Sequence, residues 1–255
     1  MRGRLLTPAL TGLLGTLLVL WVTEPASHRE LALDDVPHLH DYPALNASRS
    51  LPEIFALRHW QHIADDGLWR PVPKMMWSVI GVTESGSTGH LWFLTGLLAG
   101  LCAGLFAMCL GDRRHAMLRV IAPLTVILSP LAADVLLPFV GQADLLAALG
   151  VMGAWACWSN GGWGRAALGG ALLAVALLSK ESALPAVLAL PLALWLGEGS
   201  RSQRRRRALR ALGIGVLLLA ARLGSQVALQ GGLVPALGAA GRVVEGERSV
   251  GTLEI

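Results

Sequence analysis

The chain has few charged residues. Charged side chains make up 15% of its 255 residues, while apolar residues make up 54%. In soluble domains roughly a quarter of the residues are charged. Several apolar stretches approach the roughly 20 residues needed to cross about 30 Å of hydrocarbon. Because one soluble core cannot bury so many such stretches, the sequence predicts an integral membrane protein.

Cysteine is also scarce, with three residues in the whole chain. Cys102, Cys109 and Cys157 all fall inside apolar segments and show no C-x-x-C spacing. This distribution argues against a disulfide framework and against a zinc site. We expect the three thiols to act as small packing residues.

The formal net charge is +4, but the basic residues form short clusters between apolar segments. Such clusters carry topology information and do not indicate a nucleic-acid partner. Arg2 and Arg4 predict a cytoplasmic N-terminus, followed by a retained membrane anchor, with a signal peptide as the alternative. Nine tryptophans against a single tyrosine are consistent with a belt at the membrane interface.

The apolar pattern predicts an all-α, polytopic transmembrane bundle within residues 1–230, followed by a tail at 231–255. Three prolines interrupt the third span, which predicts a broken helix lining a cavity. Residues 179–182 are expected at the outer tip of a hairpin, and the arginines at 201 and 204–207 in a cytoplasmic loop. The expected spans, about seven, cover residues 5–22, 90–110, 117–140, 143–158, 166–178, 184–196 and 209–229.

Residues 24–89 have a different composition, rich in Asp, His, Pro and Trp, and contain no span. They are expected to form a large first extracytoplasmic loop. Apolar residues at helical spacing over 52–64 predict a short amphipathic helix on the membrane surface. Trp69, Trp77 and Trp92 are expected near the same level.

This loop begins with two adjacent carboxylates, Asp34 and Asp35. A pair at this place can accept a proton from an incoming hydroxyl or hold a metal beside a phosphate. A solvated acidic loop is the alternative. His38, His40 and Asp41 follow closely, and a metal site there competes with a surface histidine cluster. No specific motif names a metal or another cofactor.

Other candidate residues are charged groups beside or within the apolar segments. Arg70 can hold the phosphate of a lipid-linked donor, or reach toward lipid headgroups. Asp134 and Asp144 lie in or beside spans, where ionisable groups are costly and indicate function. Lys180 and Glu181 fit the same reasoning, with an interfacial salt bridge as the alternative.

Taken together, five motifs resemble the N-terminal half of the membrane domain of GT-C glycosyltransferases. Within this superfamily the chain is most similar to the transmembrane O-mannosyltransferases that carry TPR repeats. The motifs, in order, are Asp34-Asp35, Asn46, Gly67-Leu-Trp-Arg-Pro, Gly141-Gln-Ala-Asp-Leu-Leu and Ser179-Lys-Glu.

The resemblance implies an inverting enzyme that transfers a sugar from a polyprenyl-phosphate donor to a protein or glycan hydroxyl. It makes Asp34 or Asp35 the general base, and Arg70 and Lys180 the residues near the phosphate. The chain departs from the family pattern at Ser129-Pro130, where a His-Pro pair is usual, and at Gln142, where an arginine is usual. The chain also stops after about seven expected spans, where the family continues, and it lacks TPR repeats. We therefore expect a fragment, a truncated gene product or a degenerate relative.

Three functions remain open from the sequence. The first is a membrane glycosyltransferase, or its N-terminal part. It would act on the extracytoplasmic side of a plasma membrane, a bacterial inner membrane or the endoplasmic reticulum membrane. The second is an inactive scaffold or partner that keeps the same architecture. The third is a small transporter, which predicts a charged pathway across the bilayer, whereas the enzyme predicts acids and bases gathered at one end.

Overall fold

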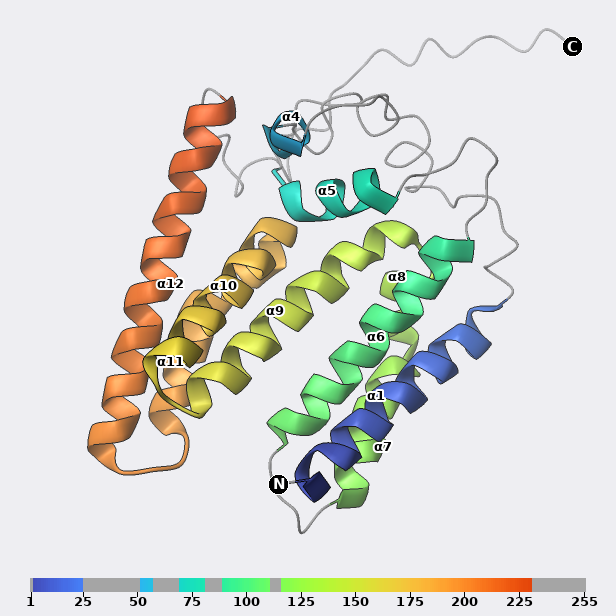
Figure 1. Ribbon diagram of the computed structural model, residues 1–255, viewed down its shortest axis with the longest axis horizontal. Coiled ribbons are helices and arrows are strands. Elements are labelled where there is room, and N and C mark those ends of the chain that lie inside the picture. Colours follow the sequence, from blue (N-terminus) through green and yellow to red (C-terminus); the bar gives the residue numbers. More distant parts are fainter. Residues whose placement is uncertain (1, 25–50, 57–68, 81–88, 111–115, 231–255) are drawn as a thin grey trace, which may run out of the picture.

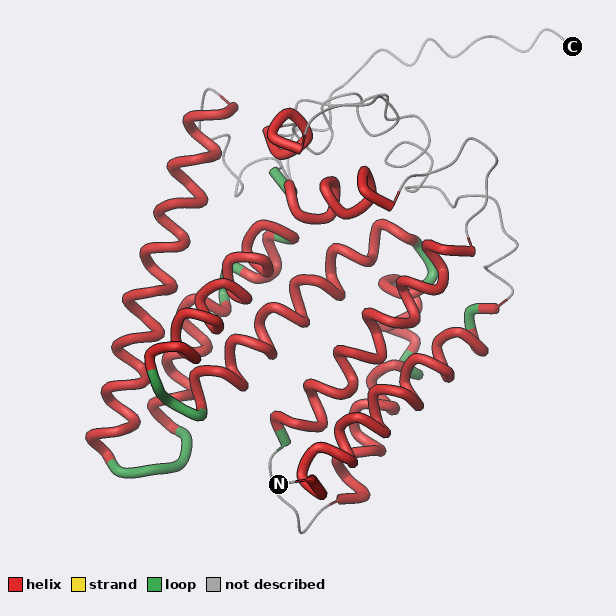
Figure 2. The backbone as a smooth tube through the Cα atoms, viewed as in Figure 1, coloured by secondary structure: helices red, strands yellow, loops and turns green. Residues whose placement is uncertain are grey.

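The computed structural model describes residues 2–24, 51–56, 69–80, 89–110 and 116–230. Within these ranges every regular element is a helix, and no strand occurs (Figure 2). The all-α prediction is therefore confirmed for this part of the chain. The acidic pair Asp34 and Asp35, the cluster at 38–41, Asn46 and the tail at 231–255 lie outside the described residues.

Helix α9 (Gln142–Ser159) lies between two groups of helices and packs against both of them (Figure 1). The first group contains α1 (Arg2–Val22), α6 (Gly89–Cys109), α7 (Ala116–Ile127) and α8 (Pro130–Leu136). The second contains α10 (Trp163–Ser179), α11 (Ala186–Leu196) and α12 (Arg201–Gln230).

Two short helices, α4 (Leu51–Ala56) and α5 (Pro71–Ile80), pack together across one end of the bundle. One-turn helices η3 (Phe139–Gly141) and η4 (Glu181–Ala183) lie at the same end, before α9 and between α10 and α11. The N-terminus of α1 and the start of α12 lie at the opposite end (Figure 1).

Three helical segments are long and apolar enough to cross a membrane: His90–Cys109, Phe139–Ser159 and Arg201–Leu229. The other apolar helices are shorter and cover Leu6–Val22, Met117–Ile127, Trp163–Ser179 and Glu181–Leu196. All seven predicted segments are thus helical, although the third is divided. The number of crossings remains a prediction.

Large apolar side chains point outward from the bundle. Leu188 and Leu217 are each 69% exposed. Of the most apolar stretch of α12, only 17% is buried inside the protein. Exposed apolar area of this extent is unusual in a soluble monomer. It is the surface expected of helices that lie against lipid tails.

The third predicted span is broken at its prolines. Helix α7 contains Pro123 and ends at Ile127, after which α8 begins at Pro130. Pro138 then precedes η3. Proline lacks an N–H and disfavours a helical conformation in the residue before it, so each helix restarts at or after a proline. The prediction of a broken helix is confirmed.

The arginine-rich segment was predicted as a loop, and this prediction was wrong. Helix α12 begins at Arg201 and runs without interruption to Gln230. Arginine is a strong helix former, and a helix that has been nucleated extends readily through such residues. Residues 197–200 alone connect α11 to α12.

Helix α5 was not predicted, although Pro71 and Pro73 suit the first turn of a helix. The expected helix over 52–64 is described only as α4, because residues 57–68 lie outside the described part. Trp69 and Trp77 are 1% exposed, so neither faces lipid. The ring of Trp69 packs edge-on against Phe55, and its Nε1 donates to the carbonyl of that residue at 2.8 Å.

Helices α1 and α6 cross closely because glycines face each other. A Cβ added at Gly100 would lie 1.9 Å from Oγ1 of Thr16 and 2.6 Å from the carbonyl oxygen of Gly12. Gly96 and Gly104 extend the same row along α6, at spacings of four residues. Such rows let helix backbones approach closely in membranes, where apolar packing replaces the hydrophobic effect.

Candidate functional site

Four of the predicted site residues gather beneath α5, at the end of the bundle that carries η3 and η4. Arg70 lies just before α5, and Asp144 lies in the first turn of α9. Lys180 and Glu181 occupy the tip between α10 and α11, where the extended backbone of Lys180 ends the helix. We call these residues, together with Arg222 of α12, the charged cluster.

Glu181 is bound by two arginines. Its Oε2 lies 2.7 Å from Nε and 2.6 Å from a terminal nitrogen of Arg70. Its Oε1 accepts a weaker hydrogen bond from Arg222 at 3.4 Å. Arg222 is 5% exposed and Glu181 20% exposed, so their charges are largely removed from solvent.

A second ion pair joins Lys180 to Asp144, with Nζ of the lysine donating to Oδ2 of the aspartate. These side chains are 29% and 26% exposed, more open than the arginine pairs. The cluster therefore has an inner part around Glu181 and an outer part that solvent can reach.

The charged cluster carries more positive than negative charge, with three cations against two carboxylates. In addition, no described atom accepts a hydrogen bond from the buried Nε of Arg222. A buried donor without a partner costs about 1 to 3 kcal/mol. Excess positive charge and an open guanidinium donor are the features of a site that receives an anion.

The fifth predicted binding residue, Asp134, does not join this cluster. It is exposed on α8 and forms none of the ion pairs described above. Among the described residues no group of three or more histidine, cysteine or acidic side chains can hold a metal ion. The predicted bases Asp34 and Asp35 lie outside those residues.

Gln142 has a packing role. It is fully buried and donates from Nε2 to the carbonyl of Leu91 and to Oγ1 of Thr95, both at 2.9 Å. Its Oε1 accepts from Nε1 of Trp77 at 3.0 Å. One amide thus links α5, α6 and α9 and holds α5 over the bundle.

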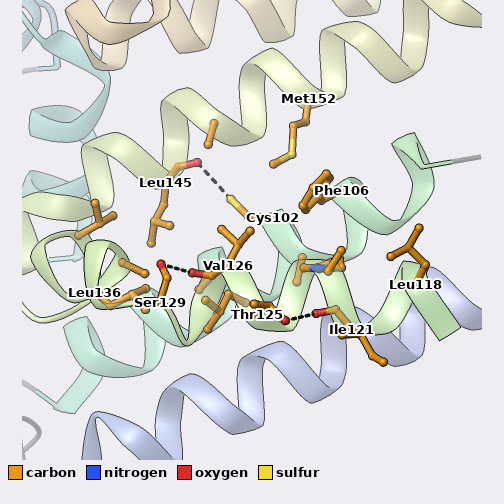
Figure 3. Close-up of a pocket in the computed structure, with 18 residues that line it drawn as sticks. Cys102, Phe106, Leu118, Ile121, Thr125, Val126, Ser129, Leu136, Leu145 and Met152 are labelled. Carbon is orange, nitrogen blue, oxygen red and sulfur yellow. Dashed lines mark hydrogen bonds between the residues drawn. The ribbon is translucent and has the colours of Figure 1, made fainter.

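An apolar cavity of about 870 Å³ lies between α6, α7, α8 and α9 (Figure 3). Phe106, Leu118, Val126, Leu136 and Met152 are among its lining residues. The hydroxyls of Thr125 and Ser129 are satisfied by carbonyls of their own segment, which leaves the lining apolar. The broken third segment therefore does line a cavity, as predicted.

Sequence reasoning missed three buried cations. Arg222 interrupts the apolar run of α12, Arg119 of α7 is 8% exposed, and Lys74 of α5 is 1% exposed. The rule that ionisable residues within spans indicate function would have found Arg222 and Arg119. Lys74 lies in the segment at 24–89 that the sequence predicts to be a loop, where no such rule applies.

No protein-family model, curated protein or solved structure matches this chain. The charged cluster and the apolar cavity are therefore the features of the described residues that bear on function.

Proposed function

We propose that this chain is an integral membrane glycosyltransferase, or part of one, that uses a polyprenyl-phosphate sugar as donor. The observation that carries the proposal is the convergence of Arg70, Lys180 and Arg222 at one end of an apolar helical bundle. A transporter predicts charges distributed along a path across the bilayer. The gathering of these groups at one end favours an enzyme.

In the proposed reaction a hydroxyl oxygen of the acceptor attacks the anomeric carbon of the donor. The bond between that carbon and the phosphate oxygen breaks, and polyprenyl phosphate leaves with the bonding electrons. The hydroxyl proton passes to Asp34 or Asp35. Arg70, Lys180 and Arg222 stabilise the negative charge that develops on the leaving phosphate.

The apolar cavity supports a donor that carries a hydrocarbon chain. Asp144 and Leu145 are neighbours in α9, and one belongs to the charged cluster while the other lines the cavity. The same part of α9 would therefore contact both the headgroup of the donor, at the charged cluster, and its hydrocarbon chain, near the cavity. Burial of each methylene of such a chain contributes about 0.8 kcal/mol.

The proposal includes a topology of about seven spans. Placing the arginine-rich start of α12 and the N-terminus in the cytoplasm follows the positive-inside rule. The charged cluster, at the other end of the bundle, then faces the extracytoplasmic side together with the loop at 24–89. Sugar transfer would take place there.

The test is transfer of radiolabel from a panel of polyprenyl-phosphate sugars in membranes that contain the full chain. We expect the Asp34→Asn, Asp35→Asn double variant to lose activity at matched expression. Arg222→Gln should raise KM for the donor about tenfold, because a charge-assisted contact to phosphate is lost. Arg165→Gln, the same change at an exposed site on α10, should behave as wild type.

A non-catalytic scaffold is the second candidate, and Gln142 favours it. The residue that replaces an arginine of the related pattern is fully engaged in packing. Absence of transfer across the whole donor panel, by a folded protein at good expression, would support the scaffold and reject the enzyme.

A further inference from the structure

A second cavity, of about 780 Å³, lies at the other end of the bundle. It is formed by the last turns of α6, α9 and α11 and by α12 near Arg207. Along α12, Arg207 and Arg222 are separated by fifteen residues, or about 22 Å at 1.5 Å per residue. This cavity is therefore distinct from the charged cluster.

The lining of this cavity is mixed in character. Arg207, Ser159, Asn160 and exposed Glu198 contribute polar groups. Trp155 and Leu194 are among the residues that contribute apolar surface. A lining with both characters matches a ligand that has a polar headgroup and a hydrocarbon chain.

Positive charge is concentrated beside this cavity. Six arginines occupy residues 201–210 of α12, and the first turn has no acidic residue. The N-terminus of a helix is the positive end of its dipole, so cations there are unfavourable. Arginines three and four positions apart also repel each other. An anion bound beside these turns would relieve both effects.

Two buried polar atoms at this end have no hydrogen-bond partner within the described part of the chain. They are Oγ of Ser159, a residue that lines the cavity, and Nε of Arg204. A terminal nitrogen of Arg204 donates to the carbonyl of Gly197 at 3.3 Å, which leaves its Nε free for another acceptor. Oxygens of a phosphodiester would satisfy donors of this kind.

The neighbouring surface has the composition of a membrane interface. Trp163 is 76% exposed at the start of α10, and its ring lies 4.2 Å from the guanidinium carbon of Arg210. Leu196 is 70% exposed close to the same end. Exposed tryptophan and arginine side by side are typical of the level of lipid headgroups.

From these observations we propose that this cavity binds one anionic glycerophospholipid. The phosphodiester lies at Arg207, Ser159 and Asn160, and a fatty acyl chain lies along Trp155 and Leu194. Basic pockets between helices on the cytoplasmic side are known to hold anionic headgroups. The site is independent of the proposed transferase reaction.

The test is native mass spectrometry of the purified full chain in detergent, titrated with phosphatidylglycerol, phosphatidylcholine or phosphatidylethanolamine. Wild type should retain one phosphatidylglycerol in preference to the other two. Arg207→Gln should weaken that binding about tenfold, the loss expected for a charge-assisted contact of about 1.4 kcal/mol. Arg206→Gln, an equal change of charge at an exposed position of the same helix, should change binding less than about twofold.

A second variant tests the role of the cavity without changing the charge of α12. Ser159→Leu fills the cavity and keeps every arginine, and it should also abolish retention of the lipid. Equal losses in Arg206→Gln and Arg207→Gln, or wild-type binding by Ser159→Leu, would overturn the proposal in favour of diffuse surface attraction. Equal retention of all three lipids, or displacement by millimolar inorganic phosphate, would also overturn it, the latter by assigning the site to a free anion.

Discussion

Arg70 and Glu181, which are 111 positions apart in the chain, form a close ion pair in which two nitrogens of the arginine lie 2.7 and 2.6 Å from one carboxylate oxygen. The other oxygen faces Arg222 of α12. Glu181 therefore holds the segment before α5 and the last part of α12 together over the tip between α10 and α11.

Glu181→Gln should lower the free energy of unfolding by about 2 to 3 kcal/mol. The amide keeps the size of the side chain but leaves Arg222, which is 5% exposed, without its counter-charge. Chemical unfolding in detergent micelles measures the change. Asp134→Asn, at an exposed carboxylate on α8, is the control and should change stability by less than about 0.5 kcal/mol. If the two variants changed the free energy of unfolding equally little, the carboxylate of Glu181 would not be needed to stabilise Arg70 and Arg222.

The pair Lys180 and Asp144 should contribute much less. Both side chains are more than a quarter exposed, so solvent screens their attraction. A double-mutant cycle with Lys180→Met and Asp144→Asn should give a coupling energy of about 0.5 to 1 kcal/mol that weakens in 1 M salt. A coupling that salt leaves unchanged would argue against an exposed pair.

Gln142→Leu should cost about 2 to 3 kcal/mol, because it leaves Nε1 of Trp77 and Oγ1 of Thr95 without their buried partner. Loss of the link to α5 should also expose Trp77, so the tryptophan emission of the chain, to which nine residues contribute, should shift to longer wavelength. Gln203→Leu is the control, because the exposed amide of Gln203 accepts only a 3.4 Å hydrogen bond from the backbone N–H of Ser200. An unshifted spectrum with native stability would contradict the role assigned to Gln142.

Gly100→Ala should destabilise the packing of α1 against α6. The added methyl would meet Oγ1 of Thr16 at 1.9 Å and the backbone of Gly12 at 2.6 Å, so the helices must separate. We expect a loss of about 2 kcal/mol or more in thermal unfolding experiments. Gly213→Ala on α12 meets nothing within 4 Å and should stabilise the helix by about 0.5 to 1 kcal/mol. A change in stability of the same sign for both variants would contradict the close crossing of α1 and α6.

Local sequence signals predicted most of the helical segments correctly. The ends of α1, α6 and α9 lie within a few residues of the predicted spans. The breaks in the third segment lie just before Pro130 and at Leu137-Pro138. The two errors, at the start of α12 and at α5, also have a local cause. The arginines at the start of α12 carry a topology signal but also favour helix, and α5 is too short to register as a span.

The sequence by itself determined which segments are apolar helices and which charged residues are exceptional in them, because hydropathy and proline act within a few residues. Arg70, Asp144, Lys180 and Glu181 were recognisable as single candidates for this reason. Tertiary structure alone decided that Glu181 pairs with Arg70 and Arg222, and that Gln142 serves packing. These partners come from different helices, and which helix faces meet depends on packing across the whole bundle, which no local pattern encodes.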